Sequence, residues 1–195
     1  MNKHILMGAF AGLMLASSAV SAQDAQQAAP AAKPDVKKVE DWFVRCFPGN
    51  SPAPCDMYEE LDDQRTRQRV VSLSVSFVPS LNRHGLTITV PLEVAIPKGL
   101  VFQTDSYTSP VLKYRMCTRD GCFVQVAVDN AMIESLAKSG PNAKINIAAD
   151  SGKPYSLNFS LKGFAAAHDD MVAQAKAKAK PVDQSAAPAA PAATP

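Results

Sequence analysis

YRMCTRDGCFVQV, residues 114–126, contains two short extended segments on either side of the turn Thr118-Arg119-Asp120-Gly121. A four-residue connection that ends in Asp-Gly favours a β-hairpin, because glycine readily adopts the positive φ that such a turn requires. Cys117 and Cys122 flank the turn and would face each other across the neck of the hairpin, close enough for a disulfide. This stretch therefore predicts antiparallel β-structure with a local cross-link.

The faces of this hairpin are mixed if Cys117 lies opposite Cys122. Arg115 would then oppose Val124, while apolar and polar side chains share the other face. Either the second strand is buried on both sides, or a bulge near Gly121 shifts the register by one residue.

Alternation with a period of two dominates the rest of the chain between residues 39 and 171. Apolar side chains alternate with Ser, Thr or other polar residues in Val71–Phe77, Leu86–Ile96 and Tyr155–Leu161, as expected for half-buried strands. Pro91 cannot donate to a ladder, so its strand should lie at an edge or carry a bulge. Shorter strands are expected at 41–46, 100–105, 111–117, 122–128 and 143–149.

Two short helices complete the expected domain. Asp129 or Asn130 can cap the first, which ends at Gly140-Pro141, and the second runs from Phe164 towards Lys180. Seven or eight short antiparallel strands predict an all-β fold, a β-sandwich of immunoglobulin-like size with one or two short helices. The alternative is a closed β-barrel, because alternation does not count sheet edges.

The ends of the chain differ from this domain in composition. Lys3, an apolar run from Ile5 to Ala16 and small residues up to Ala22 predict a signal peptide over residues 1–22, with no transmembrane span left after cleavage. Residues 23–38 are expected to be a disordered Ala/Pro/Lys linker, and 172–195 a low-complexity Ala/Lys/Pro tail. The domain itself spans 39–171.

Export makes the four cysteines, Cys46, Cys55, Cys117 and Cys122, disulfide candidates. Four cysteines allow three pairings. Short loops favour Cys46 with Cys55 and Cys117 with Cys122, and the two cross-linked alternatives stay open. Their spacing is wider than that of usual structural zinc sites, and neither pair has the Cys-x-x-Cys form at a helix start that is typical of redox-active dithiols.

Little in the sequence predicts catalysis, and no catalytic residue, metal ligand or cofactor is assigned. His84 and His168 are interpreted as exposed, in a turn and at a helix start, and no nucleophile elbow is present. The carboxylates around Glu59 are interpreted as a solvated loop. Trp42 is interpreted as a core residue packed near a disulfide. Equal numbers of basic and acidic residues in 39–167 argue against a nucleic-acid partner.

Five landmarks occur in the order that a known family shows: WFVRC at 42–46, CDM at 55–57, the run 88–100 ending VAIPKGL, YRMCTRDGC at 114–122, and LKGF at 161–164. Residues 39–171 resemble the invasion-associated locus B family of exported bacterial proteins. The resemblance implies a small β-protein without known catalysis, in which the four cysteines are disulfide partners. Members also occur in free-living bacteria, so a host role does not transfer automatically.

The expected function is that of a non-enzymatic exported protein, periplasmic, associated with the outer membrane or secreted. It would act through contacts with an envelope or host-surface protein or glycan. Interaction with a host cell is one such role. The alternatives are a periplasmic thiol/disulfide accessory protein that uses Cys117 and Cys122, and a purely structural envelope protein.

Overall fold

The computed structural model describes residues 33–179, which form ten strands and two α-helices. The signal peptide, most of the linker and the end of the tail predicted from the sequence lie outside the described residues. The elements are β1 (Asp35–Val39), β2 (Trp42–Cys46), β3 (Cys55–Asp62), β4 (Arg69–Val78), β5 (Arg83–Val90), β6 (Leu100–Thr104), β7 (Met116–Thr118), β8 (Gly121–Val128), α1 (Asn130–Lys138), β9 (Asn142–Ala148), β10 (Pro154–Ser160) and α2 (Phe164–Lys178).

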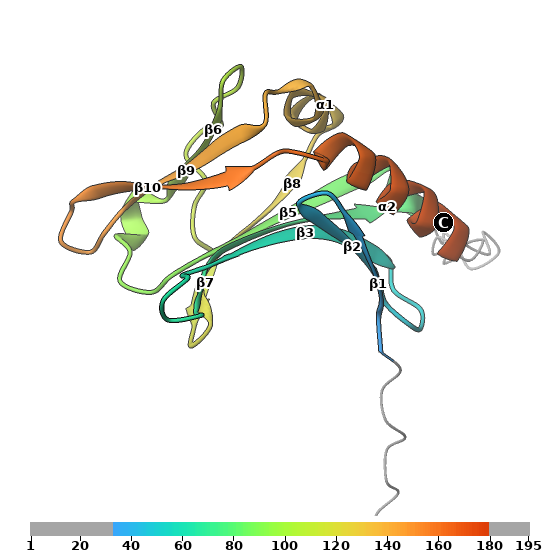
Figure 1. The fold of residues 1–195 in the computed structure, drawn as a ribbon, viewed down its shortest axis with the longest axis horizontal. Helices are drawn as coiled ribbons and strands as arrows, with labels where there is room; N and C mark the ends of the chain where they lie inside the picture. The colour runs from blue at the N-terminus through green and yellow to red at the C-terminus, as the bar shows by residue number, and fades with distance from the viewer. Residues whose placement is uncertain (1–32, 180–195) are drawn as a thin grey trace, which may run out of the picture. The chain divides into compact units, whose positions relative to one another are not determined.

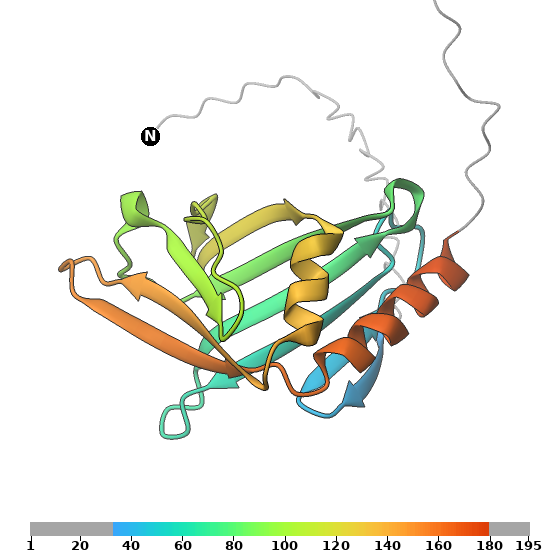
Figure 2. The same ribbon diagram turned by 90° about the horizontal axis from the view of Figure 1, so that it is seen from above.

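Two open antiparallel sheets make up this region. The larger has seven strands in the order β1-β2-β3-β4-β5-β8-β7, and the smaller has three in the order β10-β9-β6. The smaller sheet, α1 and α2 lie on the same side of the larger sheet (Figure 1). Helix α1 lies across the strands, whereas α2 runs roughly along them (Figure 2). The arrangement is β-sandwich-like, as the alternation predicts, with helices covering part of one layer.

The core lies between these layers and is built by the inward residues of the alternating strands. Trp42 is fully buried, and its ring meets the ring of Phe164 edge-on, with centroids 5.1 Å apart. Helix α2 buries one stripe of side chains at helical spacing, Phe164, Ala167, Met171 and Ala175. The start of the expected tail thus continues a helix that packs against the sheet.

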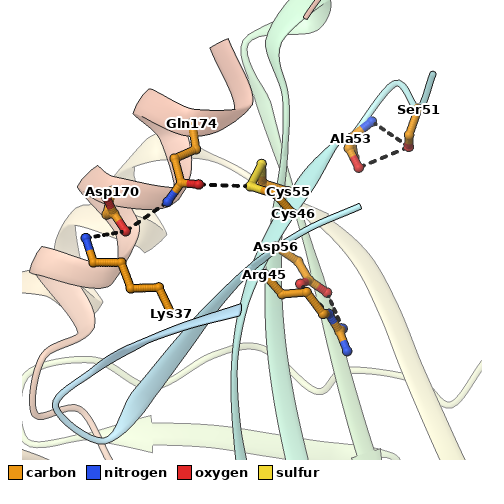
Figure 3. The surroundings of a disulfide bond; sticks show 9 residues. All are labelled: Lys37, Arg45, Cys46, Ser51, Ala53, Cys55, Asp56, Asp170 and Gln174. Atoms are coloured by element: carbon orange, nitrogen blue, oxygen red, sulfur yellow. Dashed lines mark hydrogen bonds and ion pairs between the residues drawn. A yellow bond between two sulfur atoms is a disulfide. The ribbon is translucent and has the colours of Figure 1, made fainter. Parts of the chain in front are cut away.

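Both local cysteine pairs are disulfides in the structure, Cys46 with Cys55 and Cys117 with Cys122. Figure 3 shows the first of them beneath α2, where Oε1 of Gln174 lies 3.3 Å from the Cys46 sulfur. On the same helix, Asp170 accepts a hydrogen bond from Gln174 at 3.0 Å and pairs with Nζ of Lys37 at 3.1 Å. These contacts attach α2 to the β1–β2 hairpin.

Some strand predictions were wrong. The expected strand over 86–96 ends at Val90, because Pro91 lacks an N–H and Glu93 adopts φ +67°. It is central, between β4 and β8, and not an edge strand. Of the strand expected over 111–117, only β7 forms. The mixture of polar and apolar side chains on the faces of the hairpin is therefore limited to the three residues of β7. Its register is unshifted, with Cys117 opposite Cys122.

Two strands were not predicted as such. β1 occupies Asp35–Val39, at the end of the expected linker, and pairs with β2 along its whole length. β3 runs from Cys55 to Asp62, through a stretch interpreted as a polar loop. Within residues 33–179, neither helix is long and apolar enough to span a membrane.

Candidate functional site

The face of the seven-stranded sheet that points away from the helices is not covered by any element of residues 33–179 (Figure 1). We call it the open face. The side chains that point outward alternate with the buried ones along β2, β3, β4, β5 and β8. They include Phe43, Arg45, Asp56, Tyr58, Ser72, Ser74, Ser76, Thr87, Thr89, Phe123 and Gln125.

Aromatic and cationic side chains are interleaved at one end of the open face. The rings of Phe43 and Tyr58, which are paired across β2 and β3, stack with centroids 5.4 Å apart. Nζ of Lys38 lies 5.6 Å from the Phe43 ring, and the guanidinium of Arg45 lies 4.5 Å from the Tyr58 ring and 4.9 Å from the Phe47 ring. Such cation–π pairs hold long side chains in fixed positions. We call these five residues the aromatic–cation row.

Asp56 fixes Arg45 within this row. Nε and Nη2 of the guanidinium donate to the two carboxylate oxygens of Asp56 at 3.0 and 2.7 Å, and Ser74 donates to the same carboxylate at 3.3 Å. The hydrogen bonds to Asp56 hold the pKa of Arg45 above its ordinary value. A planar, two-point pair of this kind is specific in geometry, so the Arg45 side chain is preorganised.

A groove lies beside the row, where β3 extends past the start of β2. The pairing of these strands begins at Phe43 and Tyr58, so Glu59 and the residues after it pair only with β4. The groove has a volume of about 510 Å³. It is lined by Lys38, Asp41, Phe43, Glu59, Glu60, Leu61, Asn142, Asn158, Phe159 and Ser160. We call it the Glu59 groove.

Ser160 joins the two sheets at the base of this groove. Its backbone N–H donates to Oε1 of Glu59 at 3.1 Å, and its hydroxyl donates to Asp41 at 2.7 Å. Its carbonyl accepts from Nε1 of Trp42 at 3.2 Å. Oε2 of Glu59 is buried and has no hydrogen-bond partner among the described residues.

Glu59 is the carboxyl whose chemistry this environment changes most. Its side chain is 6% exposed, and burial raises its pKa to about 7, with the negative charge of Asp41 acting in the same direction and the Ser160 N–H against it. The interpretation of Glu59 as part of a solvated loop was therefore wrong. The residue points inward from a strand because Met57, Glu59 and Leu61 share one side of β3.

The interpretation of both histidines as exposed was also wrong. His84 lies in β5 and is 6% exposed, and the side chain of His168 is 18% exposed. The turn before β5 consists of Pro79–Leu81 and Asn82, three residues earlier than the turn expected at 82–85. The rings of His84 and His168 meet between β5 and α2. Among residues 33–179, no group of three or more His, Cys, Asp or Glu side chains is arranged to hold a metal ion.

Neither disulfide contributes to the open face, and the two disulfides differ in how exposed their cysteines are. Cys46, Cys55 and Cys122 are buried, whereas Cys117 is exposed on the edge strand β7. The sequence analysis assigned no binding residues, so it missed the aromatic–cation row. The signal was present, because Phe43 and Arg45 occupy the outward positions of a strand whose inward positions are Trp42, Val44 and Cys46.

Comparisons of this chain with family models, known sequences and solved structures agree with one another. The model of the invasion associated locus B (IalB) protein family matches residues 42–172. Two invasion protein B homologues of Brucella abortus, from strain 2308 and from biovar 1 strain 9-941, are each 30% identical over 138 residues, covering 70% of this chain and 79% of theirs. The crystal structure of invasion associated protein B from Bartonella henselae aligns with a TM-score of 0.63 at 22% identity, covering 72% of this chain and 98% of that one.

Proposed function

The chain belongs to the invasion associated locus B family, and from this premise we propose that it is an exported, non-enzymatic binding protein. We propose further that it contacts a protein of the envelope or host surface through the open face. The aromatic–cation row on an uncovered sheet carries this proposal. The disulfides are compatible with an oxidising, extracytoplasmic compartment.

The composition of the row favours a protein partner over a glycan. Tyr and Arg are enriched among the residues that dominate binding energy at protein interfaces, and here they are already held in place by Asp56 and by each other. Preorganised side chains lose little conformational freedom when a partner binds. The rings of Phe43 and Tyr58 also have cations over them, which leaves them less suited to stacking on a sugar.

The Glu59 groove suggests what the partner presents at the edge of this interface. Its lining has three carboxylates and one cation, together with two amides: Asp41, Glu59, Glu60, Lys38, Asn142 and Asn158. A basic side chain of the partner in this groove would lie beside the Glu59 carboxyl and favour its ionised form. Binding would then be stronger above pH 7, where Glu59 is ionised, than below it.

Site-specific photocrosslinking in intact cells tests this proposal. A photoreactive residue at Ser72 on the open face should capture one protein, and the capture should fall at least about tenfold with Tyr58→Ala, as for the loss of a central interface residue. Ser156 provides the matched control, because it is an exposed serine on the smaller sheet. Capture that is equal from Ser156 or unchanged by Tyr58→Ala would contradict the proposal, as would a substrate turnover that Glu59→Gln abolishes.

A second candidate function is thiol–disulfide exchange, and the exposure of Cys117 favours it. In this hairpin disulfide with one exposed cysteine, an incoming thiolate can attack the Cys117 sulfur, form a mixed disulfide with it and release the Cys122 thiolate. This function requires that mild reductant opens the Cys117–Cys122 bridge and that the reduced chain then reduces a second disulfide. Resistance of this bridge to reduction in the folded chain would exclude it.

A further inference from the structure

His84 and His168 meet nitrogen to nitrogen although they are 84 residues apart, with their Nε2 atoms 3.0 Å apart. His84 lies at the start of β5, an inner strand of the larger sheet, and His168 lies in the first turns of α2. The rings also pack against Phe77 and Phe164, which fixes their planes. We propose that these two histidines form a binding site for a late first-row transition-metal ion, Cu²⁺ or Zn²⁺.

The separation of the two nitrogens is close to that of a bidentate histidine site. Two imidazole nitrogens bound to one tetrahedral ion at about 2.0–2.1 Å lie about 3.4 Å apart. The observed 3.0 Å is about 0.4 Å shorter, within the reach of small rotations of the His168 ring on the helix surface. Imidazole is the ligand type that copper and zinc prefer among protein side chains.

The second ring nitrogen of His168 supports the same assignment. Nδ1 of His168 lies 3.3 Å from a carboxylate oxygen of Asp169, and a Nδ1–H bond to it leaves the Nε2 lone pair free to bind a metal. Ligating histidines commonly donate their other N–H to a carboxylate in this way. Nδ1 of His84 is buried without a hydrogen-bond partner among the described residues.

Metal binding would replace one proton. When both rings are neutral, the contact between the Nε2 atoms requires a proton on one of them. Because His168 holds its proton on Nδ1, this proton belongs to His84, and a metal ion would take its place on Nε2 while the proton moves to Nδ1 of the same ring.

A small pocket provides room for further ligands. It has a volume of about 210 Å³ and is lined by both histidines together with Asn82, Asn130 and Glu134. Two histidines do not complete a coordination shell, so water in this pocket or the Glu134 carboxylate would fill the remaining positions. The site therefore resembles open metal sites, which keep a position for an exchangeable ligand, more than closed structural ones.

The test uses the full chain without a histidine tag, in a His4→Asn background that removes the third histidine. Titration with Cu²⁺ alone should show one bound ion whose electron paramagnetic resonance spectrum carries hyperfine splitting from two nitrogens. Zn²⁺ alone should bind more weakly, following the usual order of divalent affinities. His168→Gln should weaken Cu²⁺ binding at least tenfold and remove the two-nitrogen signature.

A matched pair of variants keeps the test decisive even if His168→Gln folds poorly. Asp169→Asn removes the carboxylate beside His168 and should weaken Cu²⁺ about tenfold. Asp170→Asn makes the same change one residue later, where the side chain faces Lys37 and Gln174, and should leave affinity unchanged. Absence of stoichiometric Cu²⁺ binding, or equal effects of these two variants, would overturn the site.

Discussion

Ser160 donates its backbone N–H to Oε1 of Glu59 at 3.1 Å across the junction of the two sheets, while Oε2 of the same carboxyl is buried without a partner. One hydrogen bond is not enough to replace the hydration of a carboxylate, so the protonated form is favoured in the folded chain. The Glu59 groove is therefore a place where stability, proton binding and ligand binding are coupled.

The first prediction concerns Glu59→Gln. A pKa raised to about 7 means that the folded chain holds the Glu59 proton more tightly than the unfolded chain does. The stability from this carboxyl is fully present below pH 4.5 and is lost as pH rises through 7. At pH 8 we expect Glu59→Gln to be more stable than the original chain by about 3 kcal/mol, with little difference at pH 4.5.

Urea unfolding at the two pH values measures this effect. Glu60→Gln is the control, because Glu60 is the next residue of β3 but its side chain is exposed and lies 3.5 Å from Arg69. It should change stability by less than about 0.5 kcal/mol at both pH values. A Glu59→Gln variant with the same pH profile as the original chain would show that the carboxyl is hydrated in solution.

The second prediction concerns the histidine pair, for which stability changes with pH in the opposite direction. The pKa of His84 is lowered, first by burial and then by the charge of His168, so the unfolded chain binds this proton more readily. The stability from neutral His84 is present above about pH 6.5 and is lost as pH falls through the folded-state pKa. His168→Gln removes the neighbouring charge and should reduce this loss.

The Glu59→Gln background isolates this effect, because the contribution of Glu59 to stability also changes over this pH range. Unfolding free energies at pH 7.5 and 5.0 in this background should differ more for the chain with His168 than for His168→Gln. Equal differences would mean that the two rings do not influence each other's protonation.

The sequence could predict the layers of this fold but not the partners of individual side chains. Alternation assigns Val71, Leu73 and Val75 to the inward face, and the structure places all three in the core. Alternation says nothing about which strand lies next to which. The contact between Glu59 and Ser160 spans 101 residues, and that between His84 and His168 spans 84.

The errors at β3 and at His84 have local physical causes. A glutamate at an inward position interrupts the apolar pattern of β3, so the strand was taken for a polar loop. Asn82-Arg83-His84-Gly85 has the composition of a turn, but the turn is made by Pro79–Leu81, with Asn82 in the left-handed region at φ +47°. In both cases a polar residue in an inward position marks a candidate site.

The third prediction compares the two disulfides. By restricting the unfolded chain, the bridge of Cys46 with Cys55 contributes about 3 kcal/mol and that of Cys117 with Cys122 about 2 kcal/mol. Replacing Cys46 and Cys55 by serine should cost more than this value, because both are buried beneath α2. Replacing Cys117 and Cys122 should cost more than about 2 kcal/mol but less than the first replacement, because only Cys122 of this pair is buried.

A useful second readout is the attachment of α2. Gln174 contacts the Cys46 sulfur, so loss of the first bridge should also increase hydrogen exchange in α2. Loss of the second bridge, in the edge hairpin, should leave exchange in α2 unchanged. Equal stability losses with no difference in exchange would contradict this assignment.

The fourth prediction returns to the turn between β7 and β8. Gly121 adopts φ +131°, and a Cβ atom added there would lie 2.4 Å from the carbonyl oxygen of Val90 in the central strand β5. Backbone strain and this clash act together, and the clashing atom is backbone that cannot rotate away. We expect Gly121→Ala to destabilise the chain by more than about 3 kcal/mol or to displace the β7–β8 hairpin.

Gly49 separates the two causes. It also has a positive φ, +90°, but a Cβ atom there would have no other atom within 4 Å. Gly49→Ala should therefore cost only the conformational strain, about 1–2 kcal/mol. Because both glycines lie in disulfide-closed loops, restriction of the unfolded chain affects them similarly. If the two variants have equal unfolding free energies, the close approach of the hairpin to Val90 is not maintained in solution.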